Sequence, residues 1–443
     1  MRYEQFKTVT LIAMIGLSLF FTYQLWTYQP TMQALETSEN EEEDNENGDD
    51  DEFIEEREVW ELIEPEQIVL HEANDTYSFV EKGSERFETM INDLQRLDLI
   101  QTIDNEDVSE LEGIEVVFPD AIPSNYLLSQ YEGDQEMIRL NEVDRMFFYS
   151  SPDSDNVSIQ FASKKADGIV TIHTSLLATD FATMLSGEEE SELSAEIAKE
   201  TDHLEMLLRE RLYVTTEPQT VAQKQYMLEP LEVTPINQRL FSSTIEVPRQ
   251  NQLNGEYVYT DGSRIVTIDG TLMFLNYSYP FVADSSETSS RHIIEAGTSF
   301  INENGAWTDE YTLSGWNVRE TSETVDFRVQ VDGLPVFYRN NDESDSMKFS
   351  VSRAGTQVTN LQRPLFRLNS LYQEYDKQVP SGKAAVSRIK QANETEWDES
   401  VTNVQLGYRA IIANRSNVEL VPTWYYESGG EWKRVPFDEE APS

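Results

Sequence analysis

The feature that most constrains this chain is an apolar segment near its N-terminus, from Thr8 to Tyr28. Gln24 is its only strongly polar side chain, and about 20 helical residues are enough to cross a hydrocarbon core. Tyr23 and Trp26 lie toward its far end, where amphipathic rings favour the membrane interface. The segment therefore predicts a transmembrane helix.

The residues that flank this segment predict its orientation. The tail at 1–7 carries Arg2 and Lys7, and an acidic tract follows the segment, which places the N-terminus in the cytoplasm and the body outside. A cleavable signal peptide is the alternative, because the most apolar stretch, Val9–Phe21, has only 13 residues. No small-residue cleavage pattern follows it, and Pro30 intervenes. We therefore expect an uncleaved signal anchor in the cell membrane.

An acidic tract separates the membrane segment from the body. Residues Glu36 to Glu64 include 16 acidic side chains and one basic side chain, Arg57, for a local net charge of −15. Such a run cannot collapse, so we expect a solvated linker. Asp44 to Glu52 has ligand chemistry for calcium but lacks the EF-hand spacing.

The charge of the whole chain is −49, and subtracting −15 for the tract leaves −34 on the other residues. The body is therefore strongly acidic as well. Because the phosphate backbone would be repelled, this charge excludes nucleic acid as a partner.

The sequence offers no recognisable catalytic or metal-binding motif. It has no cysteine, which excludes disulfides, thiolate nucleophiles and cysteine-ligated zinc. Its four histidines have no metal-ligand spacing, and neither a nucleophile elbow nor a phosphate-binding loop occurs. Ser387 and Lys390 match S-x-x-K but lack the companion motifs of that enzyme class. We expect a protein that is not an enzyme and that has no cofactor or metal. The histidines are His71, His173, His203 and His292.

The body reads as an α+β fold with antiparallel meanders. Periodicity and turn residues predict the following elements. The N-terminal part should hold a helix over Ser84–Ile103, strands at Val116–Pro119 and Val143–Tyr149, a hairpin of Val157–Phe161 with Ile169–His173, a long helix over Ser191–Arg211, and a meander of Tyr257–Tyr259, Arg264–Ile268 and Leu272–Tyr277.

Two similar units follow, each with a helix before its strands. The first should hold helix Arg291–Ile301 and strands at Tyr311–Trp316, Thr324–Val331, Asp332–Phe337 and Met347–Arg353. The second should hold helix Lys383–Ala392 and strands Val401–Ala410 and Val418–Tyr426. The division we predict is a cytoplasmic tail at 1–7, the anchor at 8–28, the linker at 29–64, an N-terminal extracytoplasmic α+β domain at 65–280, and α+β modules at 281–370 and 371–443.

Small and hydroxylated residues in the membrane segment are candidates for lateral helix contacts. Ser18 and Thr22 fit a small-xxx-small pattern, and Gly16 allows a partner backbone to approach closely. With Ala13 they are the only site residues that the sequence suggests.

Several motifs taken together resemble the YycH (WalH) family of Gram-positive bacteria, over nearly the whole chain. They are Arg2–Thr8, Leu25–Pro30, Val117–Pro119 with Ile122–Pro123, Tyr259–Gly262, Asp332–Val336, Leu406–Tyr408 and Leu420–Trp424. The long acidic tract at 36–64 is an addition to that pattern in this sequence.

The resemblance implies a single-pass membrane protein whose three-domain extracytoplasmic body ends in two similar domains. It also implies an accessory regulator of the WalK/WalR (YycG/YycF) two-component system, which governs cell-wall metabolism. Its membrane helix would contact the sensor kinase WalK (YycG) and the sister protein YycI. The residues alone leave open whether the chain forms a homodimer. They also leave open an alternative function, that of an exported cell-wall-associated enzyme or of a carbohydrate- or peptide-binding protein.

Overall fold

The structure is a computed structural model that describes residues 56–437 apart from short internal segments. Those segments are 106–107, 109–110, 134–138, 152–153, 164–167, 187–191, 202–209, 243–248, 252–255, 270, 272, 281–288, 306 and 339–346. The predicted membrane segment at 8–28 lies outside the described residues. Within them, no helix has the length and apolar character needed to span a membrane.

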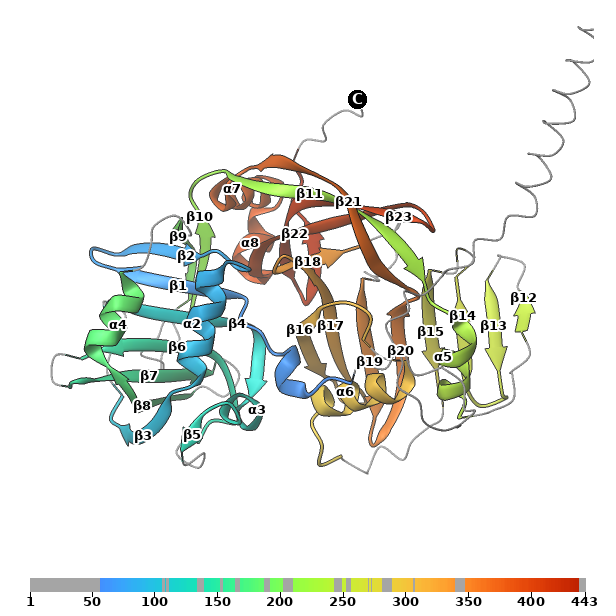
Figure 1. The fold of residues 1–443 in the computed structure, drawn as a ribbon, viewed down its shortest axis with the longest axis horizontal. Coiled ribbons are helices and arrows are strands. Elements are labelled where there is room, and N and C mark those ends of the chain that lie inside the picture. The colour runs from blue at the N-terminus through green and yellow to red at the C-terminus, as the bar shows by residue number, and fades with distance from the viewer. Residues whose placement is uncertain are drawn as a thin grey trace, which may run out of the picture. The chain divides into compact units, whose positions relative to one another are not determined.

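The N-terminal half forms a sheet whose strand order is β10-β9-β2-β1-β4-β6-β7-β8-β3-β5 (Figure 1, blue to green). Its pairs are antiparallel except for the parallel contact of β3 with β5. The strands are β1 (Gln67–Glu72), β2 (Thr76–Val80), β3 (Asp98–Ile103), β4 (Gly113–Pro123), β5 (Glu132–Gly133), β6 (Glu142–Ser150), β7 (Asn156–Ser163), β8 (Gly168–Leu177), β9 (Glu192–Thr201) and β10 (Glu210–Thr215).

The C-terminal half forms a second sheet of order β12-β13-β14-β15-β20-β19-β17-β18-β22-β23-β11-β21, with β16 paired to β17 and β24 to β23. Only the contact of β18 with β22 is parallel among the pairs described. The strands are β11 (Gln219–Pro230), β12 (Arg249–Asn251), β13 (Tyr257–Thr260), β14 (Ile265–Ile268), β15 (Phe274–Ser278), β16 (Tyr311–Val318), β17 (Glu323–Val331), β18 (Leu334–Phe337), β19 (Lys348–Ala354), β20 (Gln357–Pro364), β21 (Phe366–Val379), β22 (Val401–Asn414), β23 (Asn417–Ser428) and β24 (Glu431–Arg434).

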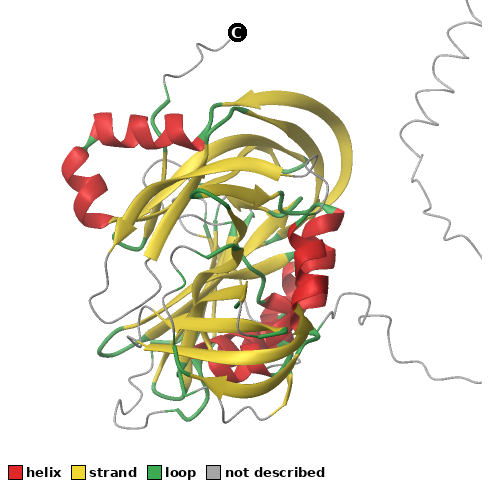
Figure 2. Cartoon of the chain, turned by 90° about the vertical axis from the view of Figure 1, so that its left-hand side faces the viewer, coloured by secondary structure: helices red, strands yellow, loops and turns green. Residues whose placement is uncertain are grey.

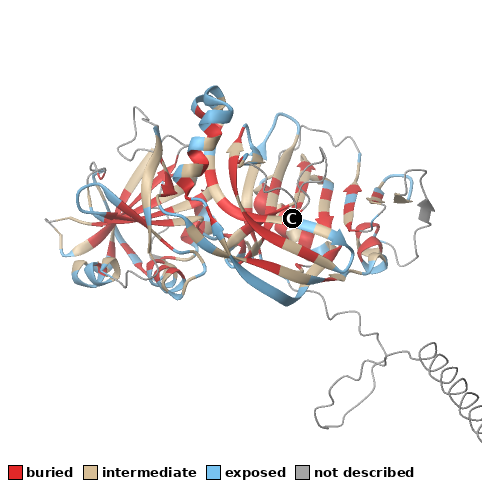
Figure 3. Cartoon of the chain, turned by 90° about the horizontal axis from the view of Figure 1, so that it is seen from above, coloured by how far each residue is buried: buried red, intermediate tan, exposed pale blue. Residues whose placement is uncertain are grey.

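The helices lie outside the strands (Figure 2). They are η1 (Val59–Leu62), α2 (Glu85–Gln95), α3 (Ser124–Leu128), α4 (Ala178–Leu185), α5 (Val233–Leu240), α6 (Ile293–Asn304), α7 (Gly382–Ala392) and α8 (Glu394–Ser400). Buried residues gather along the strands and on the inner faces of the helices, as Figure 3 shows. In α6, Gly297 lets the helix approach the sheet, since a Cβ there would lie 2.5 Å from Val325.

Local sequence signals placed most elements correctly. Ser84 caps α2 by accepting a hydrogen bond from the Phe87 N–H at 3.2 Å, and Gly305 ends α6 with a φ of 145°. The meander of β13, β14 and β15 and the pairing of β7 with β8 are also confirmed. The α+β class with mostly antiparallel sheets is therefore correct.

The long helix predicted over Ser191–Arg211 is wrong. Its described residues form β9 and β10, and β9 pairs with β2. Ala195 and Ile197 alternate along β9 and pack against the buried Val69, Tyr77 and Tyr213. Burial of this strand face stabilises the strand, although the leucines are spaced as in a helix. Three of those leucines, Leu204, Leu207 and Leu208, lie outside the described residues, as does His203.

Two element boundaries were also wrong. The helix that begins after Ser84 ends at Gln95, because the buried Leu99 belongs to β3, which pairs with β8. The strand predicted to stop at Pro119 continues to Pro123 as β4. Pro119 lies where the β4–β6 register shifts, so its missing N–H costs no ladder hydrogen bond.

The end of the acidic tract packs on the body, so it is not solvated there as predicted. Leu62 is fully buried, and Asn302 of α6 both accepts from the Arg57 backbone N–H at 3.1 Å and donates to the Arg57 carbonyl at 3.0 Å. The division into three body domains and the similarity of the last two stay predictions. Strand pairing is continuous across residue 280, because β15 pairs with β20.

Candidate functional site

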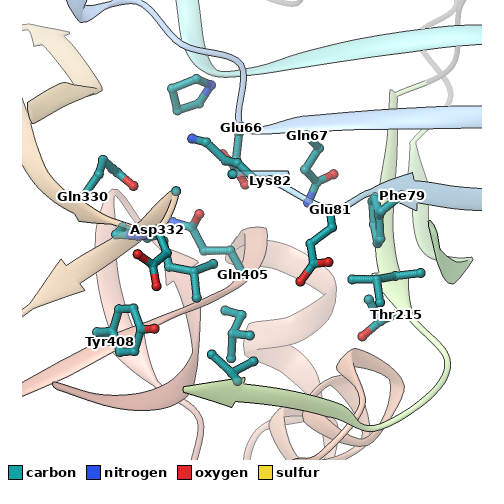
Figure 4. Close-up of a pocket in the computed structure, with 18 of the residues that line it drawn as sticks. Glu66, Gln67, Phe79, Glu81, Lys82, Thr215, Gln330, Asp332, Gln405 and Tyr408 are labelled. Atoms are coloured by element: carbon teal, nitrogen blue, oxygen red, sulfur yellow. The ribbon is translucent and has the colours of Figure 1, made fainter. Parts of the chain in front are cut away.

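A cavity of about 480 Å³ lies where strands of both sheets meet. We call it the central cavity. Figure 4 shows polar side chains converging on it from β1, β10, β17 and β22 and from the residues that follow β2. This volume is typical of small-ligand sites, which span about 300–1,000 Å³.

Two tight turns form one wall of the central cavity. Asp332 has a φ of 50° and Gly333 a φ of 72° in the turn from β17 to β18, and Gly83 has a φ of 82° after β2. A Cβ on Gly83 would lie 3.1 Å from the Asp332 carbonyl oxygen, and one on Gly333 would lie 2.8 Å from the Lys82 side chain. The turns touch closely because both have glycine at a left-handed position.

Ion pairs hold the same wall. The buried Lys224 of β11 pairs with Asp332, and burial, which alone would lower its pKa, is outweighed by that carboxylate, so the pKa is raised. Lys82 lies 3.6 Å from the Glu64 carboxylate. Strand β11 is thereby fixed to the β17–β18 turn.

Glu66 joins the beginning of β1 to β22. The Asn403 side-chain amide lies 2.9 Å from each of its carboxylate oxygens. Burial raises the pKa of Glu66 to about 7, and the hydrogen bond from Asn403 and the charge of Lys82 only partly oppose this. The carboxyl group is therefore divided between its neutral and charged forms near neutral pH.

A buried charged network lies behind the cavity wall at Tyr213, which lines the cavity. The Tyr213 hydroxyl donates to Glu115 at 2.7 Å, His71 Nε2 lies 2.8 Å from the same oxygen, and Arg145 pairs with the other oxygen. Burial alone would raise the pKa of Glu115, but Arg145 and these hydrogen bonds outweigh it and lower the pKa to about 2. Arg145 also donates to the Arg211 carbonyl at 2.8 Å, which ties β10 to β6.

The predicted chemistry-bearing residues do not gather at the central cavity. His71 belongs to the network just described, His173 contacts Ser158 at 2.9 Å, and His292 caps α6. Ser387 of α7 donates to the Lys383 carbonyl, and Lys390 lies over the Trp397 ring. Among the described residues, no group of three or more histidine or acidic side chains is arranged to hold a metal ion.

Tryptophan side chains lie both in the core and at the central cavity. Trp307 is buried against Phe327 and Phe349. Trp424 and Trp432 line the central cavity, and the Trp424 indole N–H donates to the Pro380 carbonyl at 2.7 Å.

The candidate membrane contacts Ala13, Gly16, Ser18 and Thr22 lie outside the described residues. The residues of the central cavity were not predicted as a site. Four of the motifs that carry the resemblance contribute to its lining, and they were the available signal: Val117–Pro119, Asp332–Val336, Leu406–Tyr408 and Leu420–Trp424.

Comparisons with known proteins agree over the length of the chain. A family model described as "YycH protein, C-terminal domain" matches residues 209–441, and one described as "YycH protein, N-terminal domain" matches residues 4–183. The "Two-component system WalR/WalK regulatory protein YycH" of Bacillus subtilis (strain 168) is 19% identical over 462 residues, which cover 99% of this chain and 97% of that protein. The crystal structure of YycH from Bacillus subtilis matches with a TM-score of 0.64 at 14% identity, over 87% of this chain and 99% of that chain.

Proposed function

The chain belongs to the YycH family, and on that premise we propose that it is a non-enzymatic accessory regulator of the WalR/WalK two-component system. The observation that carries this proposal is the end-to-end match to a relative whose name states that role. The shared fold of the Bacillus subtilis YycH structure supports it. In this role the chain is anchored in the cell membrane by residues 8–28, with its body outside the cytoplasm.

The mechanism we propose is lateral contact in the bilayer. The helix at 8–28 packs against the membrane helices of the sensor kinase WalK and of YycI, with Gly16, Ser18 and Thr22 at the contact, because small residues allow close helix packing. A helix that packs better against one state of the kinase shifts the population toward that state. A differential affinity of about 3 kcal/mol changes the ratio of the two states by a factor of roughly 150.

The test is kinase autophosphorylation in liposomes that contain the kinase and the full-length chain. Replacing residues 8–28 by an unrelated membrane helix should abolish the effect on the kinase, and Gly16→Leu should weaken it. Ile12→Leu is the matched control, because it lies in the same segment and removes no small residue. An unchanged effect after the helix exchange would refute lateral contact.

Co-purification separates this proposal from the alternatives. Recovery of the kinase by the full-length chain, but not by a chain lacking residues 1–28, is the expected result. Recovery by both would move the contact to the body. Recovery by neither would favour an exported enzyme or a carbohydrate- or peptide-binding protein.

A further inference from the structure

We propose that the central cavity binds a short peptide that carries an ammonium group. This inference does not depend on the regulatory role, because it rests on the lining of the cavity alone. It is supported by unpartnered acceptors, by the balance of charge and by an unpaired strand edge, which are considered in turn.

Two residues that line the central cavity carry hydrogen-bond acceptors without protein partners among the described residues. The Gln330 Nε2 group donates to Thr312 at 2.9 Å, but Gln330 Oε1 is shielded from solvent and has no donor among the described residues. Glu81 is an exposed residue whose carboxylate points into the cavity (Figure 4) and makes no hydrogen bond or ion pair within the described structure. A ligand that is rich in N–H groups can donate to acceptors of both kinds.

Two side-chain amides complete the polar lining. Gln67 comes from β1 and Gln405 from β22, and both lie among the labelled groups of Figure 4. Neither side chain has a hydrogen-bond partner among the described residues. Each amide offers a donor and an acceptor, which is the pattern that a peptide group can satisfy.

The charge of the lining favours a cationic ligand. Four acidic side chains and two basic side chains line the cavity, for a formal net charge of −2 when Glu66 is charged, and the Asp332 carboxylate is already paired with Lys224. Lys82 lies 3.6 Å from Glu64, and the buried Arg328 donates to the Val336 carbonyl at 3.1 Å with its guanidinium over the Phe337 ring. Glu64 and Asp332 are thus close to lysines, which leaves Glu81 and the charged form of Glu66 as the acids for a ligand ammonium.

A strand edge without a paired neighbour lies next to the cavity. Strand β22 pairs with β23 along one side, whereas β18 pairs with only Tyr408 and Arg409 on the other. Residues 402–406 thus have no strand partner on that second side among those the structure describes, and Val404–Leu406 line the cavity. Backbone groups of such an edge bind an added strand.

The experiment is calorimetric titration of the full-length chain in nanodiscs of neutral phosphatidylcholine. Three blocked tripeptides serve as probes, each N-acetylated and C-amidated: Ala-Lys-Ala, Ala-Glu-Ala and the neutral Ala-norleucine-Ala. The lysine peptide should bind about tenfold more tightly than the norleucine peptide, because the two differ only by the ammonium group. The glutamate peptide should bind more weakly than either.

Substitutions of residues in the cavity lining test whether the peptides bind in the central cavity. Glu66→Gln with Glu81→Gln should weaken the lysine peptide about tenfold and leave the norleucine peptide unchanged. Glu88→Gln with Glu320→Gln removes the same charge at two exposed positions outside the cavity and should change neither. Gln405→Trp fills the cavity and should abolish binding, with thermal unfolding of each variant confirming its fold.

Three outcomes would overturn the proposal. The first is equal affinity for the three peptides, or no binding of any. The second is unchanged affinity for the lysine peptide in the variant that lacks both cavity carboxylates. The third is full binding by a folded Gln405→Trp chain, which would place the site elsewhere.

Discussion

Replacement of Arg145 by methionine should be strongly destabilising, because Arg145 neutralises a carboxylate that has no access to water. Glu115 is 1% exposed and His71 is 4% exposed. Methionine keeps much of the length of arginine but leaves the Glu115 charge without its cation. It also removes the hydrogen bond that Arg145 makes to the Arg211 carbonyl of β10 at 2.8 Å.

The magnitude follows from the pKa of Glu115. The difference between the ordinary value of 4.5 and the value of about 2 in the folded chain corresponds to about 3 kcal/mol, since one pH unit is about 1.4 kcal/mol, and it is the net effect of burial, Arg145, His71 and Tyr213 together. Removing one partner of a buried ion pair costs about 3–5 kcal/mol in general. A lowered carboxyl pKa stabilises the fold above pH 4.5, and this contribution is lost as the pH falls toward 2.

Urea denaturation of the full-length chain at pH 7 and near pH 2 measures this effect. Arg145→Met should lower the free energy of unfolding by about 3 kcal/mol at pH 7, and the difference from the unchanged chain should shrink near pH 2. Arg319→Met is the control, because Arg319 is exposed, and it should change stability by less than about 0.5 kcal/mol. A loss below about 1 kcal/mol, or a loss that is equal at both pH values, would refute the electrostatic account.

Two further predictions concern the central cavity and the strand pair beside it. Burial raises the pKa of Glu66 to about 7, so its contribution to stability is present below pH 4.5 and is lost as the pH rises through 7. Between pH 4.5 and 8, the urea concentration at the unfolding midpoint should therefore fall less steeply with pH in Glu66→Gln than in the unchanged chain. Equal slopes for the two chains would contradict this. Gly407→Ala should cost about 1–3 kcal/mol, because the new Cβ would lie 2.7 Å from the Pro335 carbonyl oxygen and 2.8 Å from the Phe337 ring. Gly315→Ala is the control, because the atom nearest to its new Cβ is 3.4 Å away. If both variants lowered the thermal unfolding midpoint equally, the result would argue against close packing of β18 on β22.

Elements with a local signal at both ends could be predicted from the sequence. The helix α6 shows this, because apolar residues at helical spacing run from Ile293 to a glycine that the chain needs at positive φ. Hairpins behave likewise, since the Asp261-Gly262 turn has its glycine at a φ of 95° and joins β13 to β14. In both, residues close in sequence make the stabilising contacts.

The segment from Ser191 to Arg211 failed because its spacing suits either element. Leucines three and four apart predict a helix, yet Leu193, Ala195 and Ile197 also alternate with polar residues as in a strand. The choice depends on β2, more than 100 residues earlier in the chain, whose Tyr77 pairs with Ala195. No window along the sequence contains that partner, so local periodicity could not decide.

The central cavity could not be predicted from the sequence for the same physical reason, because its residues come from segments that are far apart in the chain. Glu66 and Asn403 are 337 positions apart in the sequence, and their side chains form a hydrogen bond. Lys224 of β11 forms an ion pair with Asp332 in the turn from β17 to β18. Each of these residues reads as an ordinary surface polar group in its own segment. Their perturbed ionisation arises only from burial between strands that the topology brings together. A site of this kind has no motif, because its chemistry belongs to the packing of the two sheets.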